Sequence, residues 1–337
     1  GGRSRRHRRM APARGAPLLS SWSVLALLFS SKVAACLTTP AVSSAANLPV
    51  LIVDNGSRRP AATLALRQVA ARLSELLGGR EVHPTSLAFS NEIPAEDLGG
   101  VRARTLRAEL LAIAESGAPG AVVVPLFLGP SGGLRRGIAD CKRELEAATD
   151  GQDAPFDLRV AACLVDEHDP SDQRVGRALA GQVIDVAHRA ELGMPLKVLV
   201  VDHGTPSAAV HAVRERLADE VSAVLGERAC AVRGASMERR DDPAYDFNEP
   251  LLERALAAPP YDEGDVVLGM AFLLPGRHAG EGGDVAQIVQ TARDAVPCAS
   301  GDDRRDELRV HTTPLLALDP LVLAVLADRV EGACRHQ

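Results

Sequence analysis

Short runs of β-branched and other apolar residues recur along the chain, and each run ends in polar residues and glycine. Val50–Val53 leads into Asp54-Asn-Gly-Ser57, and Val198–Val201 leads into Asp202-His-Gly-Thr205. Apolar runs of this length between turn residues are typical of buried strands. The segment after each run has the apolar spacing of an amphipathic helix. The apolar positions of these two helices are Leu66, Val69, Leu73 and Leu76 before Gly78-Gly79, and Val210, Val213, Leu217, Val221 and Val224 before Gly226.

The body of the chain contains two similar halves. Val50–Ser57 matches Val198–Thr205 at an offset of 148 residues, and Phe127 matches Phe272 at an offset of 145. Matches that follow in the same order with nearly constant offsets indicate an internal duplication. Strands that alternate with helices then predict an α/β fold with one parallel sheet in each half, flanked by helices.

This pattern predicts three parts of the chain. They are a leader over residues 1–46, a first half over residues 47–189 and a second half over residues 197–337. In such folds ligands bind beyond the carboxyl ends of the strands, where the loops gather. We therefore expect the site in a cleft between the halves, built from residues that directly follow strands.

Two histidines in the second half have this placement. His203 follows the strand Val198–Val201, and His278 follows the strand-like run Val266–Leu274 through the turn Pro275-Gly-Arg. Two neutral imidazoles at one sheet edge can hold a divalent metal such as cobalt, iron or nickel, although a histidine at a strand end is also commonly structural. The first half has Asn55 and Gly133 at the matching positions. The loss of both imidazoles together favours a ligand site confined to the second half.

Charged residues near these histidines extend the candidate site. Glu238 could complete metal coordination or accept substrate protons, or it could be a solvated partner of Arg239 or Arg240. Arg277, Arg239 and Arg240 could bind ligand carboxylates, and Arg58, Arg59, Arg135 and Arg136 lie at corresponding places in the first half. Weaker carboxylate candidates are Asp246 and Glu249, whereas Asp284 is expected to cap a helix after the loop Ala279-Gly-Glu-Gly-Gly.

The charge distribution argues against nucleic-acid binding. The net charge is −6, but residues 1–53 contain seven Lys and Arg and no acidic residue. The remainder has 31 basic and 44 acidic residues, a net charge of −13, and a body this acidic does not bind a phosphate backbone non-specifically. The six cysteines form no CxxC pair, which disfavours a zinc site or a disulfide framework.

The leader has the composition of a targeting segment. An apolar run, Trp22–Phe29, is too short to span a bilayer but fits a signal-peptide core. The acid-free, hydroxyl-rich stretch Leu37–Ala46 follows it and resembles a transit peptide. Together these features resemble the bipartite leader of algal plastids, and secretion is the alternative. We expect no membrane-spanning segment elsewhere.

Two motifs resemble those of the CbiX-type sirohydrochlorin chelatases, the class II, ATP-independent tetrapyrrole chelatases. Val201-Asp-His203-Gly-Thr205 is similar to the family's strand followed by His-Gly-Ser. Phe272-Leu-Leu-Pro-Gly-Arg-His278 is similar to its Phe-Leu-Leu-Pro-Gly-Gly-His, with Arg277 in place of the second glycine after Gly276. The resemblance covers residues from about 49 to 330 and implies two tandem chelatase-like, flavodoxin-like domains.

The family resemblance implies a lyase that inserts a divalent metal into sirohydrochlorin or a related tetrapyrrole for sirohaem or cobalamin synthesis. The metal substrate would be Co²⁺ or Fe²⁺, and Ni²⁺ is a further option; no prosthetic group is implied. His203 and His278 would bind the metal, Glu238 would assist, and Gly276, Arg277, Arg239 and Arg240 would contact the tetrapyrrole. We expect a monomer or homodimer. A non-catalytic metal or tetrapyrrole carrier is the main alternative, and an enzyme that uses the Gly-rich loop for phosphate is a weaker one.

Overall fold

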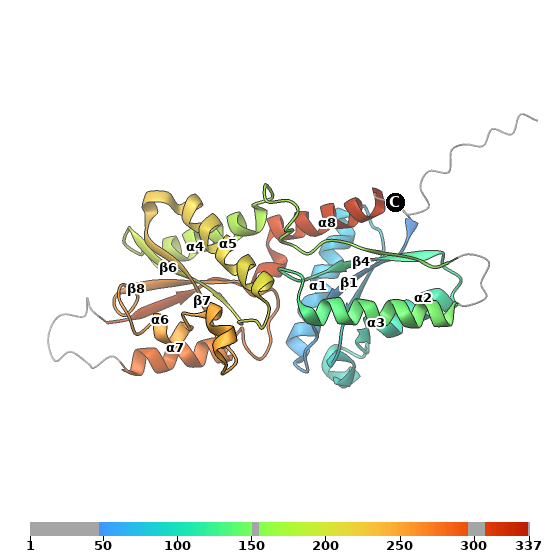
Figure 1. Cartoon of the computed structure of the whole chain (residues 1–337), viewed down its shortest axis with the longest axis horizontal. Coiled ribbons are helices and arrows are strands. Elements are labelled where there is room, and N and C mark those ends of the chain that lie inside the picture. The colour runs from blue at the N-terminus through green and yellow to red at the C-terminus, as the bar shows by residue number, and fades with distance from the viewer. Residues whose placement is uncertain (1–46, 150–154, 296–306, 336–337) are drawn as a thin grey trace, which may run out of the picture. The chain divides into compact units, whose positions relative to one another are not determined.

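The protein is described by a computed structural model over residues 47–149, 155–295 and 307–335; the expected leader lies outside these ranges. The described chain forms two parallel β-sheets with helices packed on them (Figure 1). The α/β class predicted from the sequence is confirmed. The first sheet has the order β3-β2-β1-β4-β5, with β1 (Val50–Asp54), β2 (Val82–Ser86), β3 (Arg104–Thr105), β4 (Gly120–Pro125) and β5 (Asp157–Val160). The second has the order β7-β6-β8-β9, with β6 (Leu196–Asp202), β7 (Ala229–Ser236), β8 (Asp265–Met270) and β9 (Arg309–Thr312).

The helices follow the strands much as the apolar spacing predicts. They are α1 (Pro60–Leu76), α2 (Leu106–Glu115), α3 (Gly132–Ala148), α4 (Arg174–Arg189), α5 (Ala208–Leu225), α6 (Leu252–Ala255), α7 (Asp284–Ala295) and α8 (Pro320–Arg335). Short 3-10 helices span Ser90–Glu92, Ala95–Leu98, Gly226–Arg228, Pro243–Asn248 and Leu316–Leu318. Two positions differ from what the sequence predicts. Leu76, predicted on the apolar face of its helix, is exposed at the end of α1, and only the first part of the run Val266–Leu274 forms a strand.

Alternation along the central strands distributes the apolar side chains among three cores. In β1, Val50 and Ile52 point to one face and Leu51 and Val53 to the other, as a pleated strand requires. The inward faces of β1 and β6 contribute to one common core with α1, α4, α5 and α8. The opposite faces pack on α2 and α3 in the first half and on α6 and α7 in the second.

The last helix of each half packs on the sheet of the other half. Helix α4 follows β5 of the first sheet but packs against β8 of the second sheet and against α5. Helix α8 ends the second half but packs against β4, β5 and α1, where it lies beside the first sheet in Figure 1. Since α4 and α8 also pack on each other, the two halves share one continuous core.

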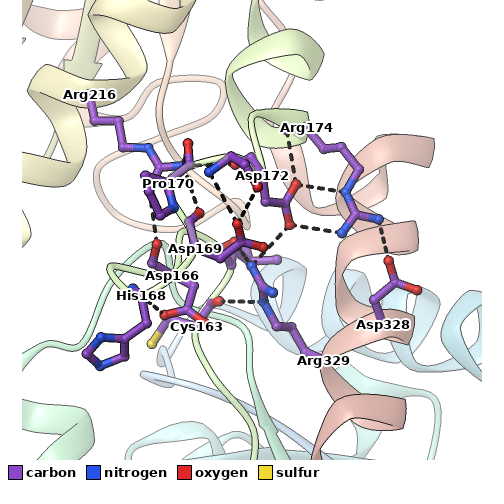
Figure 2. Close-up of polar contacts among 12 residues, drawn as sticks. Cys163, Asp166, His168, Asp169, Pro170, Asp172, Arg174, Arg216, Asp328 and Arg329 are labelled. Atoms are coloured by element: carbon purple, nitrogen blue, oxygen red, sulfur yellow. Dashed lines mark hydrogen bonds and ion pairs between the residues drawn. The ribbon is translucent and has the colours of Figure 1, made fainter.

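Polar contacts hold the segment that connects β5 to α4. Arg216 of α5 donates hydrogen bonds to the backbone carbonyls of Asp166 at 3.0 Å and Asp172 at 2.9 Å (Figure 2). Arg329 of α8 donates to the carbonyl of Cys163 at 3.1 Å and to the carboxylate of Asp172 at 3.1 Å. Two arginines from the second half thus fix the chain where it crosses between the sheets.

Within the described ranges, no helix combines the length and the apolar character that crossing a membrane requires.

Candidate functional site

His203 lies at the carboxyl end of β6, in a loop held by its neighbours. Gly204 has a φ of +88°, and a Cβ atom there would lie 1.9 Å from the carbonyl oxygen of Glu238, so only glycine fits. The amide of Thr205 donates to Asn248 Oδ1 at 2.9 Å, and Asn248 Nδ2 donates to the carbonyl of Thr205 at 2.9 Å. Because Asn248 is fully buried, these bonds fix the direction in which the loop presents His203.

His278 reaches the same place from the loop after β8. The two imidazole ring centroids are 4.4 Å apart, with ring planes inclined by 76°. His278 Nδ1 lies 2.7 Å from Asp284 Oδ2 at the start of α7. Since β6 and β8 are neighbours in the sheet, the sequence-based expectation that both histidines meet at one sheet edge is met by this geometry.

The contacts of the ring nitrogens indicate which nitrogen is available to a ligand. His203 Nδ1 lies 3.0 Å from the carbonyl oxygen of Gly204, and His278 Nδ1 faces the Asp284 carboxylate. Both of these partners accept hydrogen bonds, so Nδ1 carries the proton in a neutral imidazole and the lone pair is on Nε2. A carboxylate behind a histidine is the usual arrangement of a metal-binding imidazole.

A carboxylate stands beside this histidine pair. Glu238 Oε1 lies 3.4 Å from His203 Nε2, on a side chain that is more than half exposed. In the described part of the chain, no group of three or more His, Cys, Asp or Glu residues is arranged to hold a metal ion. The protein thus offers two imidazole ligands at once, and any further ligand has to come from water, from the substrate or from movement of Glu238.

A cavity of about 830 Å³ opens in front of the histidines and is lined by both halves. This volume lies within the range of small-molecule sites. The second half contributes His203, Arg214, Gly276, Arg277, His278 and Asp284, and the first half contributes Asp54, Asn55, Arg58, Arg59, Phe89 and Phe127. A smaller cavity of about 420 Å³ lies elsewhere, between α3 and the segment after β5. Its lining includes Arg135 of the first half but none of the predicted site residues of the second half.

A buried ionic group underlies the second-half wall of this cavity. Asp202 accepts a hydrogen bond from Ser236 at 2.7 Å and lies 3.7 Å from the guanidinium of Arg214, which is only 2% exposed. Burial raises the pKa of Asp202, while Arg214 and Ser236 act in the opposite direction. This group anchors the strand end that carries His203.

The first half has the same backbone conformation at the position that matches the His203 loop, but it lacks the two imidazoles and the carboxylate. Gly56 has a φ of +87°, and a Cβ atom there would lie 1.7 Å from the carbonyl oxygen of Ala88, so Ala88 stands where Glu238 stands. A Cβ atom built on Gly133 would lie 3.9 Å from Asn55 Oδ1. Asn55 and Gly133 are thus neighbours, as His203 and His278 are.

The arginines predicted to bind substrate divide into two groups. Arg277 and Gly276 line the cavity, with Arg277 Nε 3.5 Å from Asp284. Arg239 instead pairs with Asp246 at 3.0 Å and with Glu249 at 2.9 Å, and it does not line the cavity. Arg240 lies over the ring of Tyr245, with its guanidinium carbon 5.3 Å from the ring centroid. The structure therefore brings Arg277 to the histidine pair and leaves Arg239 and Arg240 outside the cavity lining.

Three residues of the site were not singled out for it by the sequence. Asp284 was expected only to cap α7, although its position six residues after His278 is a usable signal. No local pattern marks Asn248, because its role depends on a contact with a loop 43 residues away. Phe89 follows no motif, and only the folded chain shows that it lines the cavity.

Comparison with solved structures defines the fold as that of chelatases. SirB from Bacillus subtilis with Fe³⁺ aligns with a TM-score of 0.58 at 13% identity, over 86% of this chain and 96% of that one. The sirohydrochlorin chelatase SirB from Bacillus subtilis subspecies spizizenii in complex with cobalt gives 0.53 at 15% identity, over 86% and 95%. CbiX, described as the terminal enzyme of sirohaem biosynthesis in denitrifying bacteria, gives 0.51 at 17% identity, over 85% and 98%.

A family model matches part of the chain. Residues 49–160, about a third of the chain, match the family model described as CbiX, and this match supports the resemblance seen in the sequence. The matched residues contain neither His203 nor His278. No curated protein sequence matches the chain.

Proposed function

We propose that this protein inserts a divalent metal, Co²⁺ or Fe²⁺, into sirohydrochlorin or a related tetrapyrrole without ATP. The observation that carries the proposal is the pair His203 and His278, with ring centroids 4.4 Å apart at the edge of a cavity of about 830 Å³. The chelatase fold and the CbiX match of residues 49–160 support the same class of reaction.

The chemistry assigns a separate task to each wall of the cavity. Insertion exchanges two pyrrole protons for one divalent ion, so the site has to deliver a metal and remove two protons. The Nε2 atoms of His203 and His278 hold the incoming ion, because borderline divalent metals bind imidazole well. Glu238 accepts protons as they leave, since its carboxylate is close to the imidazoles and open to water. Arg59 and Arg277 at the cavity bind the carboxylates of the macrocycle.

The test is anaerobic metal insertion followed by the absorption spectrum of sirohydrochlorin. We expect His203→Ala and His278→Ala each to lower the insertion rate by at least about a hundred-fold, because each removes one of only two imidazole ligands. Asp284→Asn should lower metal affinity by about ten- to a hundred-fold, since it removes the charge that orients His278.

The matched control is His188→Ala, which removes an exposed histidine of α4 that does not line the cavity and should leave the rate unchanged. Unchanged insertion in the His203/His278 double variant would contradict the proposal. A wild-type protein that binds metal or tetrapyrrole with no faster insertion than the double variant would instead be the carrier named as the alternative.

We also propose delivery to plastids, with secretion as the alternative, on the composition of the leader alone. A fluorescent fusion of residues 1–46 tests this proposal: accumulation in plastids is the expected result, and export from the cell would contradict it.

A further inference from the structure

Phe89 is an apolar side chain left open in the cavity wall of the first half. Its side chain is 41% exposed although it is aromatic, and it lines the cavity that contains His203 and His278. Its backbone has a φ of +67°, a region that residues other than glycine rarely adopt. Phe89 therefore has two features that are unfavourable for the free energy of folding, an exposed ring and a rare backbone conformation. Such features persist mainly at ligand sites.

The ring is held in place from one side. The guanidinium carbon of Arg58 lies 4.5 Å from the centroid of the Phe89 ring. Arg58 is itself fixed by Glu92, with Nε 2.7 Å and a second nitrogen 3.3 Å from the two carboxylate oxygens. A cation over one face orients an aromatic ring and leaves the other face for a ligand.

The second half has nothing comparable at the matching position. Ala88 corresponds to Glu238, so Phe89 corresponds to Arg239, the next residue. Arg239 is largely buried in ion pairs with Asp246 and Glu249. The aromatic ring is thus confined to the half that carries no histidine pair.

We infer that Phe89 is a stacking platform for the flat conjugated ring of the tetrapyrrole, and that the first half binds substrate while the second half binds metal. This inference rests on the proposed function. Offset stacking on an aromatic ring suits a planar π-system. Arg59, which lines the cavity and makes no side-chain ion pair or hydrogen bond within the described residues, is available for a peripheral carboxylate.

Variants of Phe89 separate stacking from packing. We expect Phe89→Leu, which keeps an apolar side chain but removes the π-face, to weaken binding of metal-free sirohydrochlorin on the order of ten-fold. The affinity for Co²⁺ alone should be unchanged, because the imidazoles are untouched, and KM should rise more than kcat falls. The matched control is Leu64→Ala on α1, a 40% exposed apolar residue outside the cavity lining, which should change none of these values.

Phe89→Gly gives a readout that a merely structural residue would not produce. Glycine adopts a φ of +67° freely, so the melting temperature should stay equal or rise while tetrapyrrole binding weakens. A fall in the melting temperature with unchanged binding would show that Phe89 only supports the fold and would overturn the inference.

Phe89→Trp reports contact directly. The chain has one tryptophan, Trp22, so in a Trp22→Phe background the introduced indole is the only one. Its fluorescence should be quenched when sirohydrochlorin binds, and the affinity should be kept. If sirohydrochlorin binds by another measure but does not quench this fluorescence, the inference about Phe89 is overturned and the proposed function is not. A wild-type protein that binds no tetrapyrrole would overturn the proposed function as well.

Discussion

At the scale of single residues, the two halves surround the aspartate at the end of the central strand with different partners. Asp54 and Asp202 occupy matching positions, and Ser86 and Ser236 stand opposite them in the neighbouring strands. The difference is the seventh residue of the following helix, which is Leu66 in α1 and Arg214 in α5. Asp54 therefore has a leucine where Asp202 has a cationic partner, and among the described residues its buried Oδ1 atom finds no hydrogen-bond partner.

This loss predicts a specific pH dependence. Burial raises the pKa of Asp54 to about 6, against about 3.9 for an unperturbed aspartate. The folded state then binds this proton more tightly than the unfolded state. The contribution of Asp54 to the free energy of unfolding is therefore fully present below pH 4 and is lost as the pH rises through 6. Asp54→Asn should recover up to roughly 3 kcal/mol of unfolding free energy at pH 7.5 and flatten this dependence. Chemical denaturation at pH 5 and at pH 7.5 measures it.

The matched variant in the second half should behave in the opposite way. Asp202→Asn leaves the buried guanidinium of Arg214 with a weaker partner and should cost more than about 1 kcal/mol at pH 7.5. If both variants change stability in the same direction, the account of Asp54 as an uncompensated buried acid is wrong.

At the scale of elements, the exchanged helices determine which sheet a given core residue stabilises. Leu326 of α8 belongs to the second half by sequence but is fully buried in the common core, which also contains Val122 and Val124 of β4, a strand that α8 contacts. Leu326→Ala should therefore cost about 2–5 kcal/mol and increase amide hydrogen exchange chiefly in β1 and β4 of the first sheet.

The control variant is Leu252→Ala in α6. Leu252 is as buried as Leu326 but packs in the core between the second sheet and helices α6 and α7. Its effect on exchange should be centred on β6 and β7. Exchange that increases in the second sheet for both variants would contradict the exchange of helices described above.

At the scale of the whole molecule, the described residues form one compact unit with a core shared by both sheets. Separate chains of residues 47–189 and 197–337 would each lack one of the helices that cover the inner face of their sheet, α8 in the first case and α4 in the second. We expect neither chain to show a cooperative thermal transition alone, and we expect the mixture to recover one. Circular dichroism during heating measures this result. A protein cleaved only in the joint 190–196 is the control and should stay folded, because the contacts between the halves are not covalent.

The pattern of apolar and polar residues along the chain determined the class of fold and the position of two histidines at strand ends. Apolar runs closed by glycine, as at Val198–Val201, are local, so they predict strands and the residues at their ends without any long-range information. His203 and His278 follow two such runs, and a parallel sheet places neighbouring strand ends together.

Only the tertiary structure decided which sheet α4 and α8 cover, because the periodicity of a helix fixes its apolar face but not its partner. The same holds for side chains whose roles depend on distant neighbours. The sequence predicts Arg239 as a substrate-binding residue, whereas in the structure it pairs with Asp246 and Glu249. No sequence pattern predicts that Phe89 has an exposed ring in the cavity wall, since exposure and cavity lining are properties of the packed chain.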